Sequence, residues 1–242
     1  VGNDSISGQM DATAALNTAS IVDSINGGDG TDTFTMINTT ANAVSTQGVG
    51  ITNVENYKYF ASNGGDLDFD DAGSATSFEI NRTAGASNLT DVRTTDTVKF
   101  TDSAATMDAN MTYNAVNVAN AADEATVTLT GVTAGADLAF VGAVETMNII
   151  TTGTASSFAD LDFAATTTTL NITAGAALTT TGANASAGIT SATITGSGAV
   201  TLNAALSAAT TIDGSAMTGV LTIVAGATAA TISSGTADDV ID

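Results

Sequence analysis

Short segments in which apolar and polar residues alternate recur along the chain. Alternation with a period of two predicts half-buried β-strands, because successive side chains of a strand point to opposite faces. After residue 168 such segments carry two or three apolar residues each and are separated by Gly, Ala and Ser; they span residues 169–173, 192–195, 200–203, 211–213, 220–224 and 230–233. Short strands that recur every ~10 to 20 residues are typical of the coils of a solenoid.

Two longer alternating segments lie nearer the N-terminus. Residues 50–60 predict one strand, and residues 64–71 place apolar side chains on one face and carboxylates on the other. The apolar pair is Leu67 and Phe69, and the acidic residues are Asp66, Asp68, Asp70 and Asp71. Such a strand face is unfavourable without cations, because like charges that lie close together are destabilising.

This acidic cluster has three interpretations. Two carboxylates are what a glycosidase uses, and calcium binding or a lattice contact is a further alternative. We favour a solvated strand face, because nothing nearby in the sequence is expected to raise a carboxyl pKa and because the aromatic platform of a sugar cleft is missing.

A long-period repeat relates the two halves of the chain. Val54-Glu55 matches Val144-Glu145 after 90 residues, and Asp66-Leu67-Asp68-Phe69 matches Asp160-Leu161-Asp162-Phe163 after 94 residues. We therefore expect two β-solenoid modules, at residues 36–122 and 123–232. A calcium-binding segment at residues 1–35 precedes them, and a further degenerate repeat begins at residues 233–242.

The composition favours a narrow interior built from small side chains. Hydrophobic residues make up 43% of the 242 residues, which is enough for a core, whereas aromatic residues make up 5% and Trp is absent. Such an interior suits a solenoid. The chain also lacks Cys, Pro and His, which excludes disulfides, zinc-thiolate sites and a histidine base. No apolar run is long enough to span a bilayer.

The charge is strongly one-sided. Four Lys and Arg residues face 25 Asp and Glu residues, for a formal net charge of −21. A surface of this kind repels nucleic acid and anionic membranes and attracts divalent cations, so neither nucleic acid nor membrane insertion is expected. The basic residues, Lys58, Arg82, Arg93 and Lys99, lie in one window. They would suit a polysaccharide lyase, but neutralisation of neighbouring acids is favoured.

Threonine-rich strands, such as residues 126–130 and 193–195, raise the possibility of an ice-binding face. An ice-binding face needs regular ranks of Thr across many coils, and the spacing along the sequence is irregular. The β-propensity of Thr explains these segments without such a role.

One segment predicts a metal site. Gly27–Phe34 fits the nonapeptide G-G-x-G-x-D-x-U-x, which binds calcium in parallel β-rolls. Its glycines permit a tight turn with positive φ, and its aspartates supply the hard oxygen ligands that Ca²⁺ prefers. Asp23 lies one nonapeptide before Asp32, and truncated or weakened copies surround Asp4 and Asp239. The predicted calcium ligands and loop residues are Asp4, Asp23, Gly27, Gly28, Asp29, Gly30, Asp32 and Asp239.

Together these features give the chain a family resemblance. The chain resembles RTX-type surface-layer proteins of Gram-negative bacteria, notably the Caulobacter kind. The matching segments are the loop at Gly27–Phe34, the Val-Glu strands, residues 169–172, and residues 212–219 leading into 238–241. The resemblance implies a parallel β-helix, calcium-dependent assembly into a two-dimensional lattice, and type I secretion by a C-terminal signal absent from this chain. Ser234 and Ala237 depart from the glycines expected before Asp239, and the second module lacks the Gly-Gly-Asp-Gly loop.

We therefore predict an all-β chain with a parallel β-helix or RTX β-roll solenoid. It is expected to be a secreted, extracellular structural protein, not an enzyme, that binds Ca²⁺ and self-assembles on the cell surface. Its partners would be other copies and a cell-surface polysaccharide, the latter contacted through a region outside this chain. An RTX-type adhesin or other extended surface protein is the alternative, and a β-helical polysaccharide-active enzyme ranks third. The chain starts at Val1 and stops inside a repeat, so we expect it to be part of a longer polypeptide.

Overall fold

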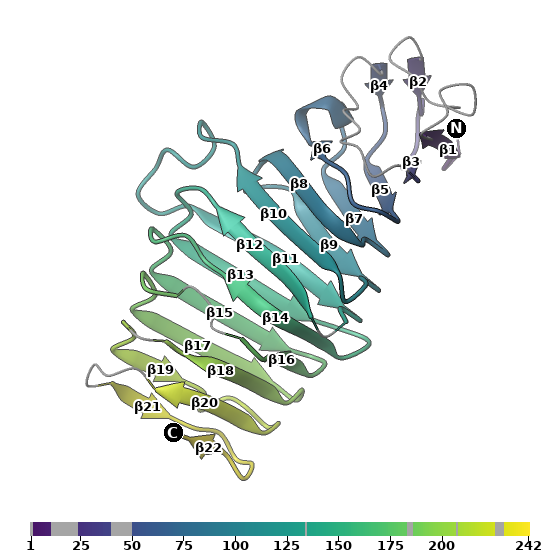
Figure 1. Cartoon of the computed structure of the whole chain (residues 1–242). Helices are drawn as coiled ribbons and strands as arrows, with labels where there is room; N and C mark the ends of the chain where they lie inside the picture. Colours follow the sequence, from purple (N-terminus) through teal and green to yellow (C-terminus); the bar gives the residue numbers. More distant parts are fainter. Residues whose placement is uncertain are drawn as a thin grey trace.

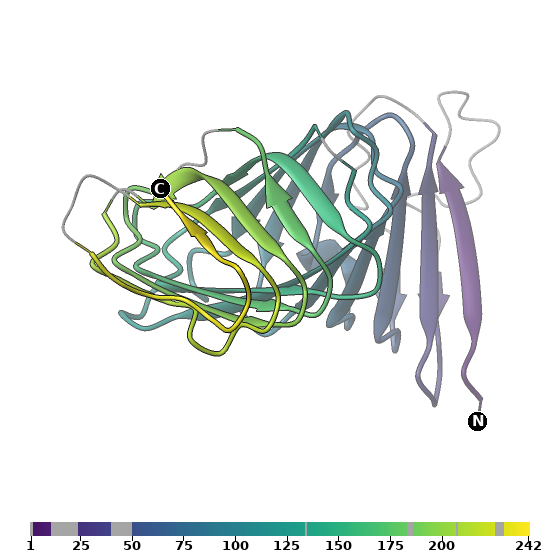
Figure 2. The same ribbon diagram turned by 90° about the horizontal axis from the view of Figure 1, so that it is seen from below.

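The strands of the protein stack in parallel into an elongated β-solenoid. The computed structural model describes residues 2–10, 24–39, 50–133, 135–182, 186–206, 208–225 and 230–242. Within these ranges the fold is all-β, and the predicted solenoid is confirmed (Figure 1). The two ends of the chain lie at opposite ends of the stack (Figure 2). None of the described segments is a helix long and apolar enough to cross a membrane.

Two parallel sheets form the body of the solenoid. The first sheet has 11 strands in the order β1 (Ser5–Met10), β3 (Thr33–Asn38), β5 (Asn56–Ala61), β7 (Ser77–Asn81), β9 (Thr97–Thr101), β11 (Glu124–Thr130), β13 (Thr146–Thr151), β15 (Thr169–Ala174), β17 (Ser191–Gly196), β19 (Thr211–Asp213) and β21 (Thr231–Ser233). The second sheet has nine strands, which are β6 (Leu67–Asp68), β8 (Gly85–Val92), β10 (Met107–Tyr113), β12 (Ala136–Val141), β14 (Ser156–Asp162), β16 (Leu178–Thr180), β18 (Val200–Leu206), β20 (Leu221–Ala225) and β22 (Val240–Ile241). A further pair, β2 (Ser24–Asn26) and β4 (Gly50–Thr52), lies near the N-terminus.

The strand register lines up equivalent residues of successive coils. Thr146, Thr169, Ser191, Thr211 and Thr231 are direct neighbours, so these coils take 20 to 23 residues each. The rows from Thr126 and Thr128 are interrupted by Asn148 and Ile150, in line with the irregular spacing, but the row from Thr146 is regular because the turns absorb the differences in length. This row lies on the outer face of the first sheet, where its side chains are partly or fully exposed.

Two predicted strands are shorter than expected. The strand predicted at 50–60 is divided into β4 and β5 by Asn53, whose φ of 50° lies in the left-handed region. The segment 64–71 contains only the two residues of β6, followed by a 3-10 turn at Asp70–Ala72. Leu67 and Phe69 are nevertheless fully buried, as the alternation predicted.

The long-period repeat corresponds to a step of four coils. β5 and β13, and likewise β6 and β14, stand four strands apart in their sheets. The sequence repeat equates Tyr57 with Met147. In the structure, however, the row of paired residues that starts at Tyr57 reaches Ile149, two residues further along β13. The shift arises because Val98, second in β9, pairs with Val127, fourth in β11. Both sheets continue through residues 122 and 123, and the segment boundaries remain predictions.

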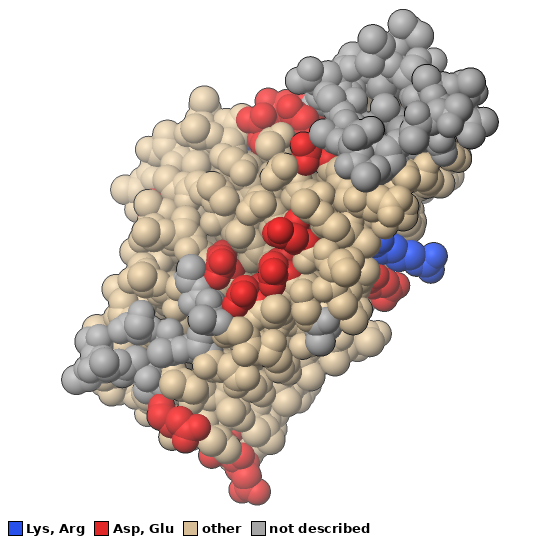
Figure 3. Space-filling model, in the orientation of Figure 1, with Lys and Arg blue, Asp and Glu red and all other residues tan. Residues whose placement is uncertain are grey.

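Charged side chains lie on the outer surface of the solenoid. Figure 3 shows acidic side chains gathered over the middle of one face and basic side chains projecting at its edge. Along β10, β12 and β14, three aspartates are direct neighbours in successive strands: Asp108, Asp137 and Asp160. The outer face of the first sheet instead carries Lys58, Glu79 and Lys99 in one row.

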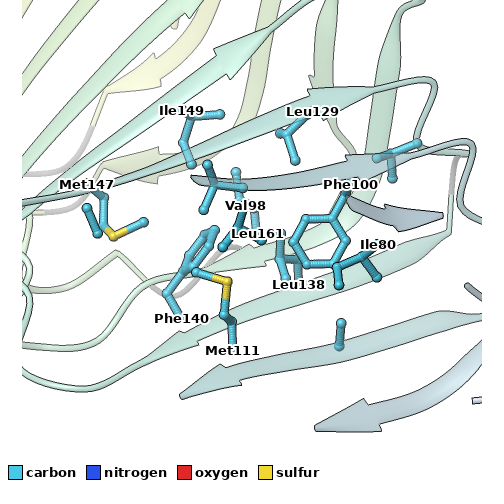
Figure 4. Close-up of a cluster of buried hydrophobic side chains, with 14 of the residues drawn as sticks. Ile80, Val98, Phe100, Met111, Leu129, Leu138, Phe140, Met147, Ile149 and Leu161 are labelled. Atoms are coloured by element: carbon cyan, nitrogen blue, oxygen red, sulfur yellow. The ribbon is translucent and has the colours of Figure 1, made fainter. Parts of the chain in front are cut away.

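The core lies between the two sheets and changes in size along the axis. One inner row of the first sheet runs Phe34, Tyr57, Phe78, Val98, Val127, Ile149, Ile172 and Ile194. Aromatic rings fill its N-terminal part, where the centroids of Phe69 and Phe78 stack at 3.8 Å. Towards the C-terminus branched aliphatic side chains replace them, and Figure 4 shows the transition, with Phe100, Leu129 and Ile149 near Leu138 and Leu161. The small-residue interior predicted from composition therefore describes the C-terminal part better than the N-terminal part.

Candidate calcium site

Acidic residues stack at the corner that precedes the first strands. Asp4, Asp32 and Glu55 stand immediately before β1, β3 and β5, whose first residues are neighbours. The backbone N–H of Asp4 donates to Asp32 Oδ1 at 2.6 Å, and the N–H of Asp32 donates to Glu55 Oε2 at 2.8 Å. The carboxylates of Asp32 and Glu55 therefore each tie their own coil to the preceding one.

Asp32 is the most unusual member of this corner. Its relative exposure is 0%, and its Oδ2 atom has no hydrogen-bond partner. The ion pairs within 4 Å among the described residues, Lys58–Glu79 and Arg93–Asp96, do not involve it. A buried carboxylate with an unsatisfied oxygen is costly unless a cation compensates it. Asp32 therefore has the environment expected of a metal ligand.

Gly27 packs closely against this oxygen. A Cβ atom at Gly27 would lie 2.6 Å from Asp32 Oδ2 and would also collide with the carbonyl oxygen of Asn53. The Asn53 carbonyl oxygen and Asp32 Oδ2 thus both lie close to Gly27, at a position that only glycine fits. Gly28 and Gly30 have φ values of 88° and 147°, which favour glycine, so the positive φ expected of the motif is confirmed at these two positions but not at Gly27.

Asparagine side chains hold the loop in place. Asn3 Oδ1 accepts the N–H of Thr31 at 3.0 Å, and Asn26 Oδ1 accepts the N–H of Gly28 at 3.0 Å. Asn53 Nδ2 donates to the same Asn26 Oδ1 at 2.9 Å. Neither these asparagines nor Glu55 is among the ligands predicted from the nonapeptide motif. The Val-Glu repeat is the one sequence signal at Glu55, and it indicates a strand rather than a site.

The remaining predicted N-terminal residues contribute less. Asp4 and Asp29 are exposed, and Asp4 meets Asp32 through its backbone N–H. Asp23 lies outside the described residues. Within the described ranges, no group of three or more acidic side chains is close enough to hold a metal ion. The oxygen donors at this corner that suit Ca²⁺ are the Asp32 carboxylate and the Asn53 carbonyl, with Glu55 beside them.

Asp239 lies at the other end of the solenoid, apart from this corner. Its Oδ1 accepts the N–H of Leu221 at 2.8 Å, and its Oδ2 is buried without a hydrogen-bond partner. The arrangement reproduces that of Asp32 on the second sheet, although the side chain is only partly buried. The two predicted ligands thus belong to separate positions in the fold.

The corner changes its chemistry along the axis. Asp123 N–H donates to Glu145 Oε2 at 2.8 Å, which repeats the Asp32–Glu55 contact. In later coils the corner residues are threonines, whose hydroxyls donate to carbonyl oxygens one coil earlier: Thr168 to Glu145, Thr190 to Thr168 and Thr210 to Thr190. Neutral hydroxyls close this corner without accumulating charge, so the need for cations falls towards the C-terminus.

The acidic cluster near β6 has a partly structural role. Asp66 Oδ1 accepts the backbone N–H of Asn88 at 2.9 Å and its side-chain N–H at 2.8 Å. Burial, followed by the charges of Asp91 and Asp70, raises the pKa of Asp68, so the expectation that nothing raises a carboxyl pKa there was wrong. No pocket opens on the part of the chain that the structure describes.

Comparison of the chain with protein-family models, curated proteins and solved structures finds no match.

Proposed function

We propose that this chain is the calcium-stabilised scaffold of a secreted, RTX-type surface layer. Calcium binds at the N-terminal corner, compensates the buried carboxylate and fixes the first coils. The coils that follow extend the two sheets into a rigid body, and copies of that body assemble into a two-dimensional lattice on the cell surface. The role is structural and not catalytic.

The observation that carries this proposal is the environment of Asp32. A buried anion with one unsatisfied oxygen, next to a converging carbonyl and inside a glycine loop, is a local arrangement that a hard cation stabilises. The extended parallel fold supports a scaffold role, because each coil adds surface without needing a separate core.

Calcium would also determine where the protein folds. Extracellular calcium modules typically have Kd values of ~10⁻⁴ to 10⁻³ M, far above cytosolic calcium concentrations. Because binding to the folded state alone stabilises it by mass action, the protein would remain less ordered during export and become ordered outside the cell.

The test measures folding and assembly with and without calcium. Circular dichroism and electron microscopy of the wild type should show β-structure and ordered arrays in calcium, and loss of both in chelator. Asp32→Ala should behave in calcium as the wild type does in chelator. Equal folding and assembly of the wild type in chelator would refute the proposal, whereas calcium-dependent monomers that adhere to cell surfaces would favour an adhesin.

A further inference from the structure

The outer face of the first sheet carries a short row of basic residues. Lys58, Glu79 and Lys99 are direct neighbours on β5, β7 and β9. Lys58 Nζ lies 3.0 Å from Glu79 Oε2, and its side chain remains 43% exposed. Lys99 forms no ion pair within 4 Å among the described residues. We call these three residues the basic row; Arg82, exposed after β7, adds a further positive charge nearby.

Glu79 does not cancel the row. Its Oε1 accepts a hydrogen bond from Asn81 Nδ2 at 2.9 Å, while its Oε2 is held by Lys58. Burial opposes its ionisation, but these hydrogen bonds and the charges of Lys58 and Lys99 lower the pKa of Glu79 below its usual value. Both oxygens are thus engaged within the sheet, and the row retains a net positive charge.

The outer face of the second sheet carries the opposite charge. Asp108, Asp137 and Asp160 form one row on β10, β12 and β14, which we call the acidic row. No Lys or Arg follows Lys99 in the sequence, so no basic residue follows along these strands. Like charges directly opposite each other on neighbouring strands are destabilising. Burial and the charges of Asp137 and Asp162 raise the pKa of Asp160, in agreement with this crowding.

The two rows match in length. Adjacent strands lie about 4.7–4.9 Å apart, so residues two strands apart are separated by about 9–10 Å. Lys58 and Lys99 are two strands apart, and so are Asp108 and Asp160. Two copies with parallel axes, staggered by two coils, would place Lys58 against Asp108 and Lys99 against Asp160.

We propose that copies of this chain stack back to front, with the basic row of one copy docked on the acidic row of the next. This inference rests on the proposed self-assembly and assigns the faces through which it occurs. The occupant is a second copy because the basic row is net positive, the acidic row is negative, and the outer members of the two rows have equal spacing; the middle members, Glu79 and Asp137, are both acidic, so Lys58 and Lys99 carry the attraction. A contact between different faces related by translation does not close on itself, so it generates an open row of molecules.

The experiment compares two variants of equal net charge. Lys58→Gln/Lys99→Gln removes two positive charges from the basic row. The control, Thr173→Glu/Thr195→Glu, adds two negative charges at outer positions of the same sheet, away from the row. Sedimentation velocity and electron microscopy in calcium should show that the Lys variant needs about tenfold or more protein to assemble, whereas the control assembles close to the wild type. Circular dichroism checks that both variants fold.

A charge exchange provides the second test. Asp108→Lys/Asp160→Lys should also prevent assembly, and its combination with Lys58→Asp/Lys99→Asp should restore it. Raising the salt concentration from about 0.1 M to about 1 M shortens the Debye length from about 10 Å to about 3 Å, so assembly should weaken.

The outcomes separate this inference from the proposed function. If every variant assembles like the wild type, the docking faces are wrong and the scaffold role stands. If the wild type forms no lattice but associates in low salt through the basic row, the scaffold role fails alone. A wild type that stays monomeric in low salt overturns both, as does a monomer that uses the row to bind an anionic polysaccharide.

Discussion

The Asp32→Asn variant should be more stable than the wild type in chelator, and calcium should remove or reverse this difference. The amide retains the Oδ1 acceptor for the N–H of Asp4 and removes the buried charge. Leaving a buried polar group unsatisfied costs about 1–3 kcal/mol, and more when it is charged. In chelator, Asp32→Asn should therefore be more stable than the wild type by at least about 1 kcal/mol.

In calcium the stability advantage of the variant should disappear or pass to the wild type. At about 10 mM calcium, about 100 times a Kd of ~10⁻⁴ M, binding adds about 2.7 kcal/mol to the wild type. The variant lacks the charge that holds the ion and should gain far less. The calcium-induced gain should therefore differ between the two proteins by up to about 2.7 kcal/mol.

Urea unfolding followed by tyrosine fluorescence and circular dichroism measures this difference. The chain has no Trp, and Tyr57 contacts Phe34 with ring centroids 5.4 Å apart, so tyrosine emission reports on the coils beside Asp32. Asp213→Asn, an exposed change of the same charge, should gain as much from calcium as the wild type. An equal gain in Asp32→Asn, or a variant less stable than the wild type in chelator, would refute the reasoning.

Three further predictions concern the core and two titrating groups. Ile172→Ala, at a position 1% exposed, should lower the free energy of unfolding by about 2–4 kcal/mol in urea titrations. Thr173→Ala, at the neighbouring exposed position, should change it by less than about 0.5 kcal/mol. Equal effects would contradict the inward and outward faces assigned to this strand. Burial raises the pKa of Tyr59 from 10.0 to about 12. The neutral phenol therefore stabilises the fold fully below pH 10.0, and this stability is lost as pH rises through the folded pKa. In a pH titration the phenolate absorbance of Tyr59, assigned by comparison with Tyr59→Phe, should appear only at a pH above 10.0. The pKa of Glu79 is lowered in the folded protein, so its ionised carboxylate should stabilise the fold at pH values above its usual pKa of 4.5. This stability should be lost as pH falls through the folded pKa. Unfolding of Lys58→Met at several pH values should show a smaller loss.

Alternation along the sequence was sufficient for the fold class but not for the strand ends. Apolar residues at every second position indicate which side chains face inwards, and Leu67 and Phe69 are buried accordingly. The break at Asn53 depends on a left-handed backbone and on a side-chain bond to Asn26. The bond joins residues 27 positions apart on successive coils, and a periodicity along the chain does not contain it.

The candidate site was predictable only within one loop. The nonapeptide identified Asp32 and the positive-φ glycines because their chemistry is local. Glu55 reaches the same corner from 23 residues away, and the register that brings it there depends on the length of the intervening turns. Rows such as Lys58, Glu79 and Lys99 also require that register, so the charges in one sequence window did not reveal a shared face.

Because every strand pairs only with the strands of the coils on either side, the protein can change length one coil at a time. Removal of residues 169–190 would bring Thr146 beside Ser191 and Ile149 beside Ile194, which are pairings of the same character as those they replace. Loss or duplication of a coil would thus shift the distance between the acidic corner and the far end by about 4.8 Å and leave the remaining interfaces unchanged. A gene encoding such a chain can lengthen or shorten the solenoid in uniform steps, without redesign of the pairing between coils.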